Sequence, residues 1–167
     1  NIYEIYNFQT MKIVKKIVLF LFVVFLIAQF FGPEKNQGDL VSIDYFLKET
    51  NPPEDVKIIL TETCIDCHSD VTQYPWYNNI TPVNFWLAAH VKDGKKHFNL
   101  SNWEGNSIKR KDHKFEELIE MIEEKEMPLN SYTWTHDEAK LTDEQRKAVI
   151  VWAKLVRLKY GLEPKPE

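Results

Sequence analysis

The sequence predicts an all-helical domain preceded by a single N-terminal transmembrane helix. Three observations support this fold class. An apolar run lies near the start of the chain, several later segments repeat apolar residues at helical spacing, and no segment alternates apolar and polar residues as a half-buried strand would. The chain has 167 residues, enough for about one domain beyond such a helix.

The apolar run follows a basic flank. Lys12, Lys15 and Lys16 precede the apolar residues 17–31. Counted from Ile13, the run has 19 positions, close to the roughly 20 that span a bilayer. Bulky side chains stand where a cleaved signal peptide needs small ones, so we expect an uncleaved anchor. Because the lysines come first, we expect a single pass through a bacterial inner membrane, with the folded domain in the periplasm.

The other boundaries follow from composition. Residues 1–10 show no periodicity and precede the first methionine, so we interpret them as an upstream extension, and residues 11–31 as the anchor. Residues 32–50 are mixed in composition, which indicates a linker containing a short packed segment. We expect the folded domain over residues 51–162 and a tail over residues 163–167.

Both cysteines lie in one stretch, Cys64-Ile65-Asp66-Cys67-His68. This is the C-x-x-C-H pattern of c-type haem attachment. Two thiols one helical turn apart can each bond to a vinyl group of one porphyrin, and the adjoining imidazole can bind the iron. We therefore predict a cytochrome c-like domain around one haem c, which is attached covalently through Cys64 and Cys67 and has His68 as axial ligand.

Three other interpretations of this stretch remain open. A structural zinc site usually has four ligands, and Cys64, Cys67 and His68 supply three. A thioredoxin-like redox pair would stand in a βαβ setting, which the sequence does not indicate. The third alternative is a small-ring disulfide with an incidental histidine.

The amino-acid composition is consistent with a large flat ligand and argues against one class of binding partner. The chain has 10 Phe, 7 Tyr and 5 Trp, enough to surround a porphyrin. The net charge is -4, which argues against a nucleic-acid partner. We expect a redox partner protein, which the sequence does not identify, and a membrane contact through the N-terminal helix.

A helix and an aromatic loop surround the motif. Pro52 and Pro53, followed by two acids, favour a helix start, and apolar residues at helical spacing carry this helix to Cys64. After the motif, residues 69–82 form a loop whose aromatic side chains, Tyr74 and Trp76 among them, could form a wall against the haem. Ordinary core packing is the alternative for these side chains.

A second helix is predicted from Pro82 to about His97. Its apolar face contains His90, which could be an alternative iron ligand but is more commonly a hydrogen-bonded core residue. The members of this face are Val83, Trp86, Leu87, His90 and Val91. Residues 98–103 then form a turn with buried anchors.

Two further helices follow. The basic run at residues 109–111 could pair with haem propionates or a partner, but we interpret it as a solvated loop before a helix capped by Asp112. The buried stripe of that helix is Phe115, Leu118, Ile119 and Ile122. The last helix starts at a capping box, Thr142 to Gln145, and its buried face is Ala148, Val149, Trp152, Val156 and Tyr160.

A methionine and a tyrosine complete the predicted haem site. Pro128 forces Met127 out of the helical region, and an extended Met beyond the motif is placed like the axial thioether of a small cytochrome. Met127 is therefore the predicted sixth ligand; His90, an open site, or a purely packing Met127 are the alternatives. Tyr132, in a second aromatic loop, is a possible haem contact.

Further motifs extend the pattern beyond C-x-x-C-H. They are Tyr74-Pro-Trp-Tyr77, Ile80-Thr-Pro-Val83, His90-Val-x-x-Gly94, Asn99-Leu-Ser101, Met127-Pro128, Tyr132, His136 and Ala139-x-Leu141. In these residues the chain resembles the bacterial haem-binding domain proteins, common in Bacteroidetes, which are small membrane-anchored chains like c-type cytochromes. The resemblance implies haem attached through Cys64 and Cys67 with His68 as axial ligand.

These observations favour a membrane-anchored periplasmic carrier of single electrons with iron bound by histidine and methionine. A haem sensor or a peroxidase-like protein with an open sixth site is the second hypothesis, and a zinc or thiol structural module is the third. No nucleophile paired with a base is evident, so an electron carrier is favoured over an enzyme.

Overall fold

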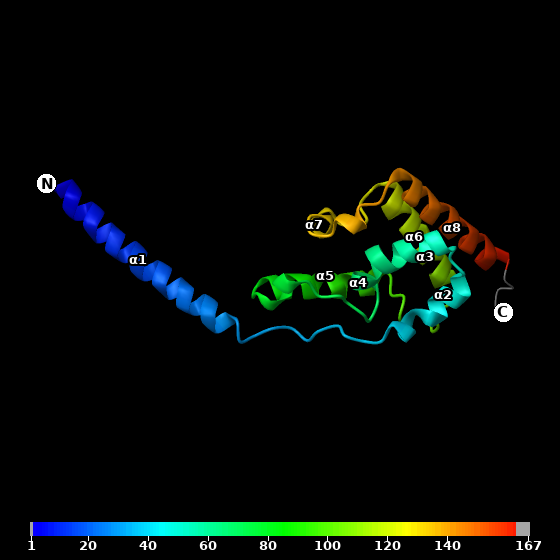
Figure 1. Ribbon diagram of the computed structural model, residues 1–167, viewed down its shortest axis with the longest axis horizontal. Coiled ribbons are helices and arrows are strands. Elements are labelled where there is room, and N and C mark those ends of the chain that lie inside the picture. Colours follow the sequence, from blue (N-terminus) through cyan, green and yellow to red (C-terminus); the bar gives the residue numbers. More distant parts are fainter. Residues whose placement is uncertain (1, 163–167) are drawn as a thin grey trace. The chain divides into compact units, whose positions relative to one another are not determined.

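The computed structural model describes residues 2–162, with side chains from residue 9 onward. Asn1 and the predicted tail, residues 163–167, lie outside the described residues. Helices dominate, and over residues 2–162 there is one isolated bridge, between Gln37 and Val71, and no strand. The all-helical part of the predicted fold class is therefore confirmed for these residues. In chain order (Figure 1) the elements are α1 (Ile2–Ala28), η1 (Leu40–Ile43), α2 (Asp44–Thr50), α3 (Glu54–Ile59), η2 (Leu60–Cys64), α4 (Ile65–His68), η3 (Trp76–Asn79), α5 (Val83–His97), α6 (Ile108–Glu123), α7 (Asn130–Thr133), η4 (Asp137–Ala139) and α8 (Asp143–Leu162).

The chain divides into two compact units. Unit 1 consists of Asn1–Glu34 and Tyr74–Ala89, and unit 2 of Lys35–Gln73 and His90–Glu167. Helix α5 therefore contributes its first half to unit 1 and its second half to unit 2. The C-x-x-C-H motif belongs to unit 2.

The predicted transmembrane helix is wrong. Of the helices described over residues 2–162, none combines the length and the apolar character needed to cross a membrane. Helix α1 carries Lys12, Lys15 and Lys16 and ends at Ala28, so its uninterrupted apolar stretch is residues 17–28. At about 1.5 Å per residue this stretch is about 18 Å long, whereas the hydrocarbon core is about 30 Å thick.

The location predicted from that helix is corrected with it. The single-pass inner-membrane assignment is wrong, and the periplasmic placement has no support without it.

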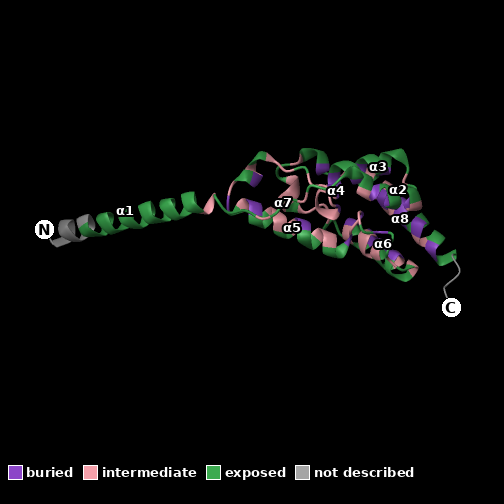
Figure 2. Ribbon diagram, turned by 90° about the horizontal axis from the view of Figure 1, so that it is seen from below, coloured by how far each residue is buried: buried purple, intermediate pink, exposed green. Residues whose placement is uncertain are grey.

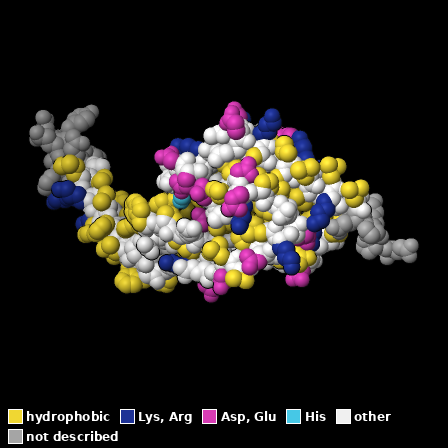
Figure 3. Space-filling model, turned by 45° about the vertical axis from the view of Figure 1, so that its right-hand side comes forward, with side chains coloured by type: hydrophobic (Ala, Val, Ile, Leu, Met, Phe, Trp, Pro, Cys, Tyr) yellow, Lys and Arg dark blue, Asp and Glu magenta, His cyan; other side chains and the backbone are white. Residues whose placement is uncertain are grey.

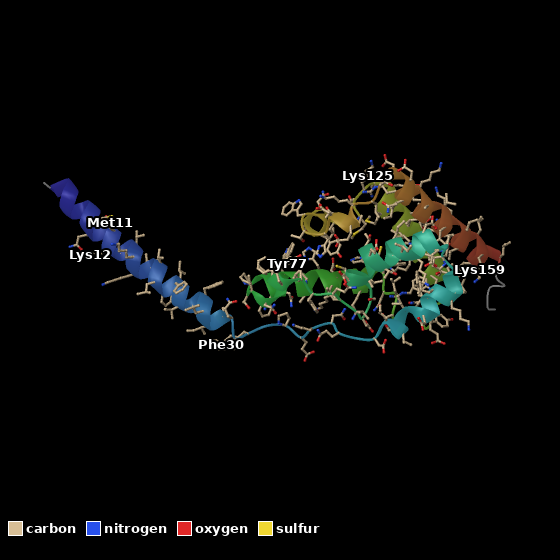
Figure 4. The ribbon with its side chains drawn as sticks, viewed as in Figure 1. Met11, Lys12, Phe30, Tyr77, Lys125 and Lys159 are labelled. Carbon is tan, nitrogen blue, oxygen red and sulfur yellow. The ribbon has the colours of Figure 1, made fainter. Side chains whose placement is uncertain are left out.

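Figure 4 shows Lys12 projecting from α1 and Phe30 beyond its last turn. Hydrophobic side chains follow along the rest of α1 (Figure 3).

The core of unit 2 is a cluster of aromatic rings. The ring of Phe46 lies edge-on to Trp103, with 5.1 Å between centroids, and Phe115 lies edge-on to Trp152 at 5.2 Å. Phe46 and Phe115 are fully buried. Helices α2, α6 and α8 supply these rings together with the segment after α5, and buried residues mark these helices in Figure 2. Residues 40–50, which lie within the predicted linker, thus provide part of the core.

The last helix confirms its predicted cap and buried face. Gln145 Oε1 accepts from the Thr142 backbone N–H at 2.8 Å, and Thr142 Oγ1 accepts from the Gln145 N–H at 3.2 Å, which is a complete capping box. Val149, Trp152 and Val156 are buried against α6, which packs alongside α8 (Figure 1). The 3.6-residue pattern was reliable here because the helix has one continuous apolar face.

The start of α6 differs from the prediction. The N-cap is Ser107, whose side chain accepts from the Arg110 N–H at 3.3 Å, whereas Asp112 lies inside the helix. With the helix starting at Ile108, Lys111 falls one turn before Phe115 on the buried face. Lys111 is only 3% exposed, so the predicted solvated loop at residues 109–111 is wrong.

One predicted core residue of α5 is also corrected. Trp86 is 46% exposed, whereas Asn84, which was not predicted to be inside, is buried. The Asn84 side-chain amide donates to Thr81 Oγ1 at 3.0 Å, so a polar partner compensates for its burial. Amphipathic spacing by itself cannot reveal such a partner.

Candidate functional site

The motif lies at the end of a nearly continuous helical segment built from α3, η2 and α4. Val56, Ile59 and Ile65 are buried and hold this segment against the core of unit 2. Element η2, whose last residue is the first cysteine of the motif, is a turn of π-helix, a feature that is frequent at functional sites. Cys64 and Cys67 form no disulfide, and both residues are partly buried.

Both thiols are neutral at neutral pH. Burial, with a smaller effect from Cys67, raises the pKa of Cys64 to about 12. Burial and the negative charge of Asp66 raise the pKa of Cys67 to about 11. Neither cysteine therefore has the depressed pKa of a thioredoxin-type nucleophile.

His68 is held in the form that a metal-binding imidazole needs. Its Nδ1 lies 2.8 Å from the carbonyl oxygen of Phe98. Because a carbonyl oxygen can only accept, Nδ1 carries the proton and Nε2 keeps its lone pair. Burial lowers the pKa of His68, outweighing hydrogen bonds to the backbone of Phe98 and Gly94, so the ring is neutral at neutral pH. A neutral imidazole whose Nδ1–H is bonded to a carbonyl is the usual arrangement of a histidine ligand.

The end of α5 and the residues directly after it hold His68 and the loop that follows the motif. The Leu100 N–H donates to the His68 carbonyl at 2.8 Å, so His68 is bonded to this segment through both its ring and its backbone. The ammonium group of Lys95 lies 2.6 Å from the Asp70 carboxylate. The motif helix and the end of α5 are therefore one packed element of unit 2.

A short strap, residues 36–38, fixes the loop after the motif. The Asn36 amide donates to the Ser69 carbonyl and to Thr72 Oγ1, each at 2.9 Å. The Gly38 N–H donates to the carbonyl oxygen of Asp70 at 2.6 Å. These bonds place the strap, which lies within the predicted linker, in contact with the residues that follow His68.

The structure brings Tyr132, a predicted haem contact, to the motif. Its hydroxyl donates to Asp66 Oδ2 at 2.8 Å, and the other oxygen of Asp66 accepts from the Gln73 N–H at 2.8 Å. The Tyr132 ring stacks on the His136 imidazole with 4.1 Å between centroids. Burial, followed by the charge of Asp66, raises the pKa of Tyr132, so the tyrosine stays protonated. Asp66, one of the two residues between the cysteines, thus anchors the 130–136 loop.

Met127 shares a core with the motif. Met127 and Cys64 both pack, partly buried, against the same hydrophobic cluster. The Met127 backbone is fixed, because its N–H donates to the Met121 carbonyl at 3.2 Å and its carbonyl accepts from Arg146 Nη1 at 3.0 Å. Ligation by Met127 stays a prediction.

The other predicted contacts lie elsewhere on the chain. His90 is partly buried on α5, one turn before Gly94. Tyr74 and Trp76 belong to unit 1, whereas the motif belongs to unit 2. Their role as a haem wall stays a prediction, as does that of His90 as an alternative ligand.

The residues of the site fit a covalently attached haem. Cys64 and Cys67, three residues apart on helical backbone, share one face, and His68 directly after them has Nε2 available. Across the described part of the chain, no group of three or more His, Cys, Asp and Glu side chains converges as a metal ion would require.

Two features of the site were not predicted from the sequence. One is the Phe98 carbonyl that accepts from His68, a backbone atom that no residue pattern identifies. The other is the close approach of Gly94 to Cys67. An indication of the second was present, since an isolated glycine inside a helical pattern often has a packing reason.

Comparison with known protein families identifies a haem-binding family. A family model described as "Haem-binding domain" matches residues 23–155, which include the whole motif, the second half of α5 and Met127. No curated protein and no solved structure matches the chain.

Proposed function

The chain belongs to the haem-binding domain family, and from this premise we propose that it carries one haem c and transfers single electrons. In this proposal Cys64 and Cys67 form the thioether bonds and His68 is the axial ligand. The observation that carries it is the 2.8 Å hydrogen bond between His68 Nδ1 and the Phe98 carbonyl, which leaves Nε2 available for iron.

The residues around the motif would have distinct tasks. A bound haem would supply an iron that alternates between the ferrous and ferric states, which is the chemistry of one-electron transfer. The Phe98 carbonyl orients His68 and strengthens it as a donor. Asp66, held by Tyr132 and by the backbone after the motif, fixes the turn that carries the two sulfurs.

We propose Met127 as the second axial ligand. Its support is the packing of Met127 and Cys64 on one cluster and the fixed backbone on both sides of Met127. Thioether ligation raises the reduction potential relative to two imidazoles, as suits an electron carrier. The partner would be a redox protein.

Haem attachment is tested on the full chain, made in cells that assemble c-type cytochromes. We expect a coloured protein whose haem stays with the polypeptide in denaturing electrophoresis. A Cys64→Ser/Cys67→Ser double variant should lose this covalent haem. In the His68→Ala variant, haem should remain attached with an altered visible spectrum. A colourless wild-type protein would exclude the proposal.

Electron transfer is tested by the coordination state of the haem iron and by its reaction with small ligands. A carrier should remain six-coordinate and low-spin in both oxidation states and should bind carbon monoxide slowly. Rapid binding of carbon monoxide or peroxide by the wild-type protein would instead indicate a sensor or a peroxidase-like protein with an open site.

A further inference from the structure

The contact between α5 and the motif helix leaves no room for a side chain at Gly94. A Cβ atom at this position would lie 2.5 Å from the carbonyl oxygen of Cys67 and 3.1 Å from its Cβ. A Cβ atom essentially never lies closer than 3.0 Å to a non-bonded heavy atom. Because the nearest neighbour is backbone, no side-chain rotation can relieve the clash, and the two helices would have to separate.

Phe98, the residue directly after α5, accepts the hydrogen bond from His68. The Phe98 N–H donates to the Gly94 carbonyl at 2.9 Å, so a single helical turn joins the point of closest approach to Phe98. The Phe98 carbonyl then accepts from His68 Nδ1 at 2.8 Å. The separation of the helices at Gly94 therefore sets whether the Phe98 carbonyl reaches the imidazole.

We propose that Gly94 is a positioning residue for the axial histidine. Its missing side chain lets α5 approach the motif closely enough for the Phe98 carbonyl to hold His68. This inference rests on the proposed haem function and specifies how the chain tunes its ligand. A hydrogen bond from Nδ1–H makes the imidazole a stronger donor and favours ferric iron. Lengthening that bond would favour ferrous iron.

The test is the reduction potential of the haem-loaded full chain with Gly94→Ala. We expect a shift to more positive potential, with the ferric-to-ferrous ratio at a fixed potential falling about tenfold. This takes as its scale the lower end of what losing an outer-shell partner costs in metal affinity or activity. The ligand-sensitive bands of the visible spectrum should shift as well. A wild-type potential and spectrum in this variant would overturn the inference.

Two other glycines serve as matched controls. At Gly38 a Cβ would lie 2.8 Å from the Asp70 carbonyl oxygen, a backbone clash that does not involve Cys67. Gly38→Ala should lower the midpoint of urea unfolding but shift the potential less than Gly94→Ala does, because its clash is with Asp70 and not with the motif itself. At Gly161, in α8, a Cβ would meet nothing within 4 Å. Gly161→Ala should leave both the potential and the spectrum unchanged. Equal potential shifts at Gly38 and Gly94 would overturn the inference, because general loosening would then explain both.

A second variant decides the question if Gly94→Ala does not fold. Asn99 Oδ1 accepts from the Ser101 N–H at 2.9 Å and the Asn102 N–H at 3.2 Å, shaping the turn directly after Phe98. Asn99→Ala loosens that turn without adding an atom, so we expect a smaller shift in the same direction. An unchanged potential would overturn the inference while the coloured wild type upholds the haem function. A colourless wild type would exclude both.

Discussion

Replacing Glu49 by glutamine should lower the free energy of unfolding by about 3 kcal/mol, because it leaves a buried lysine without its counter-charge. Glu49 Oε2 lies 2.7 Å from Lys111 Nζ, and the side chains are 16% and 4% exposed. The other oxygen of Glu49 accepts from the Tyr160 hydroxyl at 2.6 Å and from the Trp103 indole at 3.2 Å. This carboxylate therefore joins α2, α6 and α8 around the core.

The magnitude follows from the burial of the pair. Removing one partner of a buried ion pair costs about 3–5 kcal/mol, because the remaining charge stays desolvated. The lower end applies because Glu49 is partly exposed and because a glutamine oxygen can still accept from the lysine. If the described units unfold together, the midpoint of thermal unfolding should fall by about 6–12 °C.

The assay is urea unfolding of Glu49→Gln, Lys111→Met and the double variant. The double variant should lose much less than the sum of the two single losses, because it leaves no unpaired charge. Lys154→Met is the control, since its pair with Glu123 is about half exposed and should contribute less than about 0.5 kcal/mol. A loss below about 1 kcal/mol for Glu49→Gln, or strict additivity in the double variant, would refute the reasoning.

Three further predictions concern pH, a hydrogen bond and the sixth ligand. Burial alone would raise the pKa of Glu49, but hydrogen bonds from Lys111 and two tyrosines lower it below 4.5 in the folded protein. The stability that Glu49 contributes is therefore present above pH 4.5 and is lost as the pH falls through its lower folded pKa. In the Glu49→Gln/Lys111→Met variant, the free energy of unfolding should therefore fall less steeply as the pH is lowered. Tyr132→Phe should cost about 1 kcal/mol in urea unfolding through the lost bond to Asp66, and an unchanged midpoint would contradict this. In the Met127→Ala holoprotein, the weak ferric band near the red end of the visible spectrum should disappear, and its persistence would exclude Met127 as the ligand.

Local patterns in the sequence predicted most of the helices of unit 2. These patterns involve residues that are close together along the chain. They are the prolines and acids before Val56, the capping box at Thr142, and the apolar stripes of α6 and α8. Such features are settled by backbone hydrogen bonding and by one buried face, so periodicity identifies them. The C-x-x-C-H stretch is of the same kind.

The turn at the end of α6 shows the limit of these patterns. The helix ends at Glu123, and Lys125 has a positive φ of 60°, which only a few residue types adopt readily. Figure 4 shows Lys125 at this turn. Pro128 predicted that the helix stops nearby, but the sequence did not indicate which residue would adopt the left-handed conformation.

By itself, the sequence predicted that the described part of the chain is built from helices and that the chain belongs to a haem-binding family, and both predictions are confirmed. The three residues that it assigns to haem attachment and ligation stay a prediction. Tertiary structure alone decided that Lys111 is buried against Glu49 and that Gly94 lies close to Cys67. The physical reason is the distance along the chain between the residues that interact. A helix or an attachment motif is specified by neighbours along the chain, whereas burial of a charge and the approach of two backbones depend on residues far apart in sequence, whose packing no local pattern encodes.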